Sequence, residues 1–231
     1  MSPPRAANPL APVPGSHLAK RLSILETAAS VFCREGYGGT NIDLIASEAG
    51  VSRQTVYNHY GDKETLFRAV VAEVTERCNA DFFATLATFP DRPGDLGADL
   101  AAFAVRLNST CLCSRDGKFL RRLMQNEGER YPELFAAWRE AGPGKTWSAL
   151  AARFARLAHS GHLDVDDPDV AARQFLALNT ADLQIPLMLG QTPTDEEAQR
   201  SAIRAVRTFL RAYGRKSPAA AADSQKSTAG T

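Results

Sequence analysis

The sequence predicts an all-α protein in which a long helix joins a small N-terminal unit of short helices to a larger helical bundle. Three observations predict this fold class. Apolar residues recur at spacings of three and four along most of the chain, and no convincing alternating strand pattern occurs. Short helical segments crowd into the first quarter, and longer ones follow. With 231 residues, 44% of them hydrophobic, the chain suffices for one large or two small domains.

The helical segments follow one another between two biased ends. Residues 1–16 contain five prolines and predict a disordered arm, and the Ala/Ser-rich residues 214–231 predict a disordered tail. Between them we expect a small domain over 17–62 and a larger one over 63–213. The helices are expected at 17–36, 41–49, 52–59, 63–87, 95–112, 116–130, 132–159 with an interruption at 142–144, 168–189 and 195–213. In the 168–189 segment, Pro186 should kink or stop the helix.

Composition excludes several classes of protein. The longest uninterrupted apolar run, at 100–105, is six residues long, against the roughly 18 that a membrane-spanning helix needs, and the N-terminus lacks a signal-peptide pattern. We therefore expect a cytoplasmic protein without membrane association. The four cysteines form no C-x-x-C pair, which favours a reducing compartment and no zinc site. A net charge of +1 does not by itself indicate an acidic partner.

The first helix and the segment after it carry an ordered set of signals. The apolar stripe on helix one consists of Leu18, Leu22, Leu25, Ala29 and Phe32, and the helix stops at Gly36. Thr40 is placed to cap a second helix, whose buried face consists of Ile42, Ile45 and Ala46. Gly50 suits a turn that needs a positive φ, and Ser52 caps the next helix. This order of residues predicts a helix-turn-helix.

Helix geometry assigns roles on the second helix of this motif. With Val56 facing inward, Gln54 and Asn58 each lie about 160° away and point outward together. Their amides suit adenine, the Thr55 methyl suits a thymine methyl, and Arg53 can reach a guanine or a phosphate. Side chains with hydroxyl, imidazole or ammonium donors suit phosphates instead. Those are Thr40, Tyr57, His59 and Lys63.

Residues 18–67 resemble the DNA-binding domain of TetR-type transcriptional regulators. The residues that carry the resemblance are Ala28-Ala29, Phe32, Gly36-Tyr37, Thr40, Ile42, Ile45, Ala46, Gly50-Val51-Ser52, Val56-Tyr57-Asn58-His59-Tyr60 and Asp62-Lys63-Glu64-Thr65-Leu66. The resemblance implies that Thr40, Ser52, Arg53, Tyr57, His59 and Lys63 meet DNA. Residues 119–189 are similar to the C-terminal domain of the AefR-like branch, whose members resemble repressors of efflux and stress genes.

This resemblance implies a ligand-responsive regulator, a repressor that binds a palindromic operator as a homodimer and is released by a small, largely apolar molecule. The last two helices would pair with their copies. On the last one, an apolar stripe of Ile203, Val206, Leu210 and Tyr213 accompanies an arginine stripe. The arginine stripe, Arg200, Arg204, Arg207, Arg211 and Arg215, is a solvated or ion-paired face or else a second nucleic-acid surface.

A ligand cavity in the larger domain is implied by the resemblance, and several residues suit it. The candidates are Phe103, Leu107, Cys111, Met124, Gln125, Trp138, Trp147, Phe175, Asn179 and Asp182. Ordinary core packing explains each apolar member equally well. Asp182 is either a surface residue or a polar group with a partner, such as a cationic ligand. Cys111 suits a redox sensor or an inert buried thiol.

Two other classes compete with a DNA-binding regulator. Between residues 17 and 70, six basic residues balance six acidic ones, so a strong electrostatic footprint for DNA is missing. The alternative is therefore a helical dimeric ligand-sensing or interaction module without specific DNA binding. An enzyme would need a catalytic constellation, and neither Cys111-Leu112-Cys113 nor His159-Ser160-Gly161-His162 has the form of one. We expect no enzyme, no cofactor and no bound metal.

Overall fold

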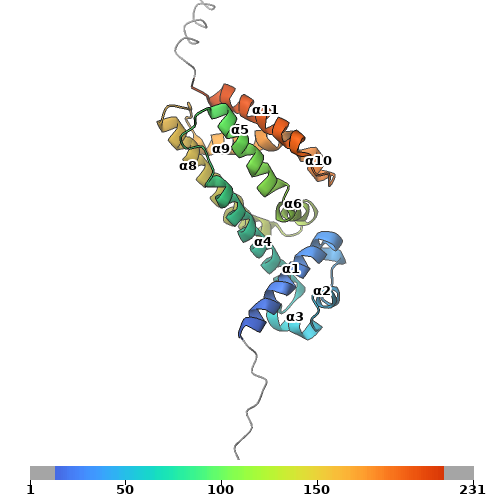
Figure 1. Ribbon diagram of the computed structural model, residues 1–231. Helices are drawn as coiled ribbons and strands as arrows, with labels where there is room; N and C mark the ends of the chain where they lie inside the picture. Colours follow the sequence, from blue (N-terminus) through green and yellow to red (C-terminus); the bar gives the residue numbers. More distant parts are fainter. Residues whose placement is uncertain (1–13, 216–231) are drawn as a thin grey trace, which may run out of the picture. The chain divides into compact units, whose positions relative to one another are not determined.

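The computed structural model describes residues 14–215, and all regular elements in this range are helical (Figure 1). One isolated bridge joins Leu163 to Gly214. No helix in the described range is long and apolar enough to cross a membrane. The described part of the chain forms two compact units, one built from the residues up to Val74 with Leu123–Tyr131, the other from Thr75–Arg122 and the residues from Pro132 onward.

The first unit consists of three helices, the beginning of a fourth and the end of a sixth. They are α1 (Pro14–Gly39), α2 (Ile42–Glu48), α3 (Arg53–Tyr60), α4 (Lys63–Leu86), which continues into the second unit, and α6 (Arg115–Glu127), which begins there. Its core contains an aromatic cluster of Phe32, Tyr37, Phe67 and Tyr131, whose neighbouring rings lie 4.8 to 6.0 Å apart. Apolar burial on α1, α2 and α4 thus fixes the motif that carries α3.

Helix α1 differs from the prediction in where it starts and in which residues of its apolar stripe are buried. It begins at Pro14, inside the segment expected to be a disordered arm, because proline is tolerated in the first turn, where its missing N–H has no partner to lose. Leu18 and Leu22 are 57% and 44% exposed, and the core face begins at Ile24. At the expected stop, Gly36, the structure shows a kink with a non-helical φ of 69°, and the helical segment continues to Gly39. The rest of the expected arm and the tail beyond 215 lie outside the described residues.

The cap of α2 is one residue later than expected. Asn41 has an extended backbone and its side chain accepts a hydrogen bond from the Leu44 N–H at 2.7 Å. The prediction that Thr40 caps α2 is therefore wrong. Thr40 instead donates its hydroxyl proton to the Gly36 carbonyl at 2.7 Å, which satisfies an acceptor at the end of α1.

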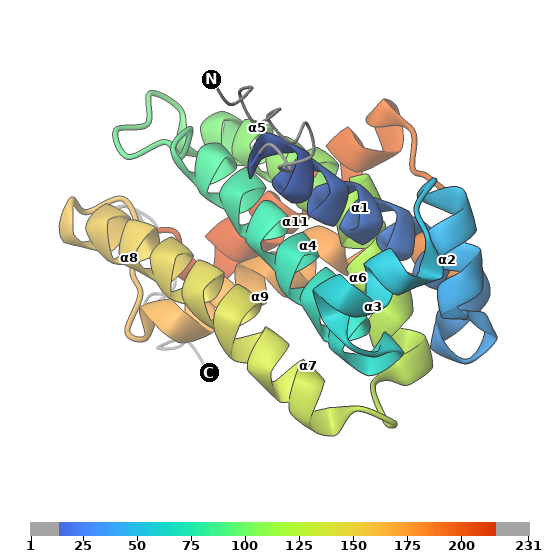
Figure 2. The ribbon, with the colours of Figure 1, turned by 90° about the horizontal axis from the view of Figure 1, so that it is seen from below.

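The second unit is a helical bundle. Its elements are the rest of α4, α5 (Leu96–Leu107), η1 (Asn108–Leu112), the start of α6, α7 (Pro132–Arg139), η2 (Glu140–Gly144), α8 (Lys145–His159), α9 (Pro168–Ala181), α10 (Gln184–Met188) and α11 (Asp195–Tyr213). Helix α11 packs against α5 and α9, and α9 packs against α8 (Figure 2). The core between them contains Phe103, Phe154, Phe175 and Phe209, each at most 1% exposed.

Two expected helical segments differ from the prediction, and the interruption predicted in a third is confirmed. The 95–112 segment is α-helical only to Leu107 and then continues as the wider π-turn η1. The 116–130 segment ends at Glu127. The interruption expected at 142–144 is confirmed as the π-turn η2, which contains Pro143.

The 168–189 segment breaks well before its proline. Helix α9 ends at Ala181, and the short α10 begins at Gln184 with Pro186 in its first turn. A proline ring clashes with the carbonyl four residues earlier and offers no N–H to it. For Pro186 that carbonyl belongs to Asp182, which lies at the observed break. The prediction that Pro186 interrupts the helix is confirmed, and the break lies one turn before the proline.

Candidate nucleic-acid interface

The turn between α2 and α3 fixes how α3 is presented. Gly50 has a φ of 65°, which a residue with a side chain rarely adopts. The Val51 N–H then donates to the Ala46 carbonyl at 3.0 Å, and the Ser52 hydroxyl accepts from the Thr55 N–H at 3.1 Å, which caps α3. The predicted turn and the Ser52 cap are thereby confirmed.

The buried and exposed faces of α3 follow the predicted geometry. Val56 is 1% exposed and Tyr60 is 6% exposed, so this face of α3 packs into the unit. Gln54 and Asn58 both lie on the exposed face, and the Gln54 amide Nε2 donates to Asn58 Oδ1 at 2.9 Å. Thr55 is half-buried, and its hydroxyl lies 2.8 Å from the Ser52 hydroxyl. The helix thus presents two neighbouring amides to solvent.

Arg53, which is exposed, and Tyr57, which is half-buried, form a second polar group on α3. Arg53 Nη2 donates to the Tyr57 hydroxyl at 3.2 Å, and its guanidinium carbon lies 5.3 Å from the centre of the Tyr57 ring. Arg53 Nη1 also donates to Asp43 of α2 at 3.2 Å. The hydrogen bond to Tyr57 and the charge of Asp43 raise the pKa of Arg53. Asp43 had no expected contact role, because it is ten residues from Arg53 and no local pattern pairs them.

Thr40 and Lys63 are tied into the fold. Thr40 is 2% exposed. The Lys63 ammonium donates to the carbonyls of Tyr37 and Thr40 at 2.9 and 2.8 Å, and it lies 4.3 Å from the Tyr37 ring centre. Two of the three ammonium protons are therefore used inside the unit. Both residues hold the loop between α1 and α2 beside the start of α4.

His59 lies at the end of α3 beside a basic segment of α1. Its ring centre is 4.3 Å from that of His17. Burial lowers the pKa of His59 below its ordinary value, and three neighbouring groups lower it further. These neighbours are His17, Arg21 and Lys20. Positive charge therefore gathers where α1 meets the end of α3.

Ion pairs explain why the unit lacks a strong positive field. Arg34 pairs with Glu35 and Glu48, each at 2.6 Å. Arg53 pairs with Asp43, and Arg68 pairs with Glu64 at 2.8 Å. Three of the six basic residues counted from the sequence are thus compensated by a neighbouring carboxylate.

The ligand candidates of the larger domain are spread over different environments. Phe103, Leu107 and Phe175 lie within the core of the second unit, each at most 2% exposed. Cys111 packs against the same core. Burial raises the pKa of the Cys111 thiol to about 12, which suits an inert thiol better than a redox sensor. These four residues share one packed region.

Asn179 forms a buried amide pair. Its Nδ2 donates to Asn108 Oδ1 at 2.8 Å and to the Ala104 carbonyl at 3.2 Å, while Asn108 Nδ2 donates back to Asn179 Oδ1 at 3.2 Å. Asn179 is 1% exposed and Asn108 is 0% exposed. The pair joins α9 to the start of η1, and the partner of Asn179 was not identified from the sequence.

The other candidates lie apart from this core. Trp147 is 36% exposed on α8, and Trp138 is half-buried on α7. The buried Trp138 Nε1 is the only buried side-chain nitrogen or oxygen in the described residues without a hydrogen-bond partner. Met124 and Gln125 belong to the first unit. The structure therefore does not gather all ten candidates into one site.

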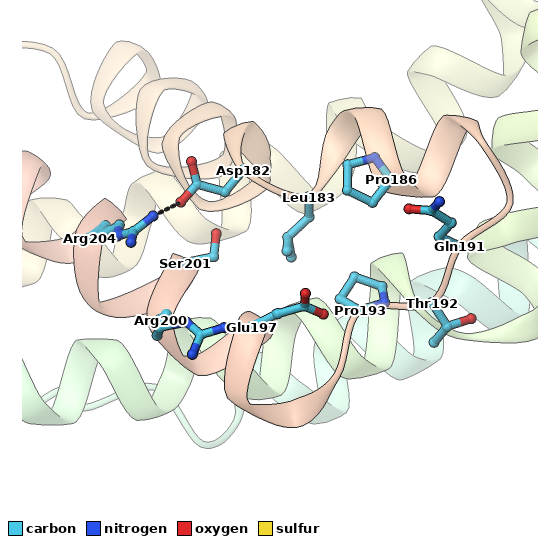
Figure 3. Close-up of a pocket in the computed structure, with 10 residues that line it drawn as sticks. All are labelled: Asp182, Leu183, Pro186, Gln191, Thr192, Pro193, Glu197, Arg200, Ser201 and Arg204. Atoms are coloured by element: carbon cyan, nitrogen blue, oxygen red, sulfur yellow. Dashed lines mark hydrogen bonds and ion pairs between the residues drawn. The ribbon is translucent and has the colours of Figure 1, made fainter.

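Asp182 lines a cavity of about 280 Å³ between the α9–α10 break and the first turns of α11 (Figure 3). It is exposed at the surface and pairs with Arg204 at 3.4 Å, so it is a surface residue that also has a partner within the chain. The other lining residues are Leu183, Pro186, Gln191, Thr192, Pro193, Glu197, Arg200 and Ser201. The sequence predicted a helix over 195–213 with an arginine stripe on it but gave no signal for a cavity there.

A glycine turn between two short helices, with a polar exposed face on the second, defines a DNA-binding protein of the helix-turn-helix class. Residues 24–70 match the family model of bacterial regulatory proteins of the tetR family. Residues 98–215 match the C-terminal domain of AefR-like transcriptional repressors. The chain belongs to the TetR family and is a DNA-binding transcriptional regulator.

Relatives and solved structures agree with this assignment. The HTH-type transcriptional repressor Rv1474c of Mycobacterium tuberculosis is 26% identical over 187 residues, which is 80% of this chain and 89% of the relative. A TetR-family regulator from Mesorhizobium loti has a TM-score of 0.77 at 30% identity, covering 86% of this chain and 98% of the other. The flavonoid-responsive regulator FrrA has a TM-score of 0.64 at 28% identity, covering 86% and 99%. These relatives are regulators of transcription, not enzymes.

Proposed function

We propose that this regulator reads its operator with the exposed face of α3 and holds the phosphate backbone with the residues around it. Gln54, Thr55 and Asn58 read base edges, and the single observation that carries this is the exposed Gln54–Asn58 amide pair at 2.9 Å. Ser52, Tyr57 and His59 contact phosphates. For Thr40 and Lys63 we propose a smaller role in phosphate binding. The Thr40 hydroxyl already donates to a backbone carbonyl, and Lys63 has only one ammonium proton left for a phosphate.

We further propose a homodimer that binds a palindromic operator, with the recognition helices about 34–36 Å apart in successive major grooves. Support comes from the exposed apolar side chains of α10 and α11 in the second unit. Ile185, Met188, Leu189 and Ile203 are between 49% and 71% exposed. A second copy would remove this apolar surface from water. The protein would act in the cytoplasm, where its operator lies.

A small, largely apolar effector is proposed to release the repressor from its operator. The unpartnered Trp138 Nε1 supports a ligand near α7, because a buried donor needs an acceptor. The related regulator FrrA is described as flavonoid-responsive, which supports the same class of effector. Such an effector works only through different affinities for the DNA-bound and released states.

Selection of bound sequences from a random pool of duplex DNA at a fixed salt concentration tests this function. We expect an enriched inverted repeat. Replacing both Gln54 and Asn58 by alanine should abolish the operator preference and leave weak nonspecific binding, because the amides are exposed and contribute little to folding. Unchanged selectivity of the double variant would refute the assigned readers. A folded dimer that enriches no sequence would support an interaction module instead.

Tyr57→Phe separates phosphate binding from base reading. The Tyr57 hydroxyl oxygen accepts from Arg53, which leaves its own proton free to donate to a phosphate. We therefore expect the variant to weaken binding to all sequences alike, by about 10-fold to 150-fold for one lost hydrogen bond to a charged group. Titration of the selected site and of a scrambled duplex measures this. A loss confined to the selected site would contradict the phosphate role and would mean that the hydroxyl acts only through its hydrogen bond with Arg53.

A further inference from the structure

Arg53 makes three contacts with two residues in the structure, Asp43 and Tyr57. Asp43 Oδ2 accepts from Nη1 and the Tyr57 hydroxyl accepts from Nη2, both at 3.2 Å. The Tyr57 ring lies 5.3 Å from the guanidinium carbon. A single exposed ion pair restrains an arginine only weakly, but an ion pair, a hydrogen bond and a ring contact together restrict its rotamers more. The guanidinium is thus positioned at the first turn of the recognition helix.

The carboxylate of Asp43 makes Arg53 a poor phosphate ligand. Affinity for phosphates comes mainly from net positive charge and the counterions that it releases. Arg53 and Asp43 together carry no net charge, and a phosphate approaching Arg53 also meets the Asp43 carboxylate. Reading a base edge depends instead on directed hydrogen bonds, which a compensated guanidinium still makes.

The remaining donors suit a base with two acceptors on one edge. A guanidinium has five N–H groups, and two of those of Arg53 are used by Asp43 and Tyr57. Three remain, and a guanine needs two of them, for its N7 and O6 in the major groove. The neighbouring phosphate is then left to the Tyr57 hydroxyl, whose proton is free.

We propose that Asp43 is a positioning residue that directs Arg53 to a guanine of the operator half-site and away from the phosphate backbone. This rests on the proposed function, because it requires a specific operator. It assigns Arg53 to guanine, where the sequence left guanine and phosphate open, and it adds to the site a residue of α2 that touches no DNA itself.

The test compares operator selection by the wild-type protein with selection by Arg53→Ala and Asp43→Ala. The arginine variant should lose the preference for guanine at one position of each half-site. The aspartate variant should reduce the preference at that same position by about fivefold or more, the lower end of what a bidentate contact contributes. Its binding should also become more salt-dependent, by about one unit of the logarithmic slope, because the freed Arg53 turns to a phosphate.

Glu48→Ala is the matched control. Glu48 is also on α2 and pairs with an arginine at 2.6 Å, but that arginine is Arg34 of α1. The control removes the same charge and should leave every base preference unchanged. Thermal melting of all variants checks the fold, which should persist because Asp43 is 62% exposed.

Each other result has a defined meaning. An Asp43→Ala protein that keeps the guanine preference which Arg53→Ala loses overturns the positioning role. An Arg53→Ala protein that weakens all sequences alike overturns the guanine assignment and makes Arg53 a phosphate ligand. Equal loss in the Glu48→Ala control attributes the effect to charge alone and also overturns it. A wild-type protein that selects no sequence refutes the proposed function itself, and the guanine assignment with it.

Discussion

Phe175→Ala is expected to lower the free energy of unfolding by about 3–5 kcal/mol, the range for deletion of a buried aromatic ring. Phe175 is 0% exposed. Its ring centre lies 5.2 Å from those of Phe154 and Phe209 and 6.4 Å from that of Phe103. Removing the ring leaves a cavity that helices α5, α8 and α11 cannot fill without losing their own contacts.

Trp147→Ala is the natural comparison, because both residues are candidates for the ligand site. Trp147 is 36% exposed, so its truncation should cost less than that of Phe175. Urea denaturation at one fixed protein concentration measures both, since dimerisation makes stability depend on concentration. A small cost for Phe175, similar to that for Trp147, would mean that its ring borders an open space and would favour the ligand role.

The helix-turn-helix could be predicted because each of its signals is local. Gly50 needs its positive φ, Ser52 caps the helix that starts at the next residue, and Val56 is buried by helical spacing alone. The outward direction of Gln54 and Asn58 follows from the same spacing. All of these relations span at most a few residues, so the sequence contains them directly.

The remaining features depend on contacts between distant residues. Asn108 and Asn179 are 71 residues apart, and Arg204 and Asp182 are 22 apart. Each asparagine reads in the sequence as an ordinary polar position, and only the packing of α9 against η1 pairs them. Leu18 and Leu22 are the opposite case. They continue the apolar stripe of α1, but no other described part of the unit buries them. Periodicity predicts the apolar face of a helix but not how much of that face other helices cover.

The second large effect on stability is expected at the end of α6. There the Glu127 carboxylate, 90 residues away in sequence, accepts a hydrogen bond from the backbone N–H of the residue after Gly36. Glu127 Oε1 accepts from the Tyr37 N–H at 3.1 Å, and Glu127 is 7% exposed. Tyr37 is only 8% exposed, so water does not readily replace this acceptor. Glu127→Ala should therefore lower the free energy of unfolding by about 1.5–3 kcal/mol, the range for a hydrogen bond to a charged group.

Glu127→Gln keeps an acceptor oxygen without the charge, and Glu129→Ala removes an exposed carboxylate two residues away. The glutamine variant should lose only part of the stability and the Glu129 variant almost none, while hydrogen exchange at the Tyr37 amide should accelerate most in Glu127→Ala. Equal losses in the alanine and glutamine variants would assign the effect to the charge and not to the hydrogen bond.

Helix α6 begins in the second unit and ends in the DNA-binding unit, and this bond joins the rest of the DNA-binding unit to the end of that shared helix. Its loss should therefore also weaken operator binding, although Glu127 is not among the residues proposed to touch DNA.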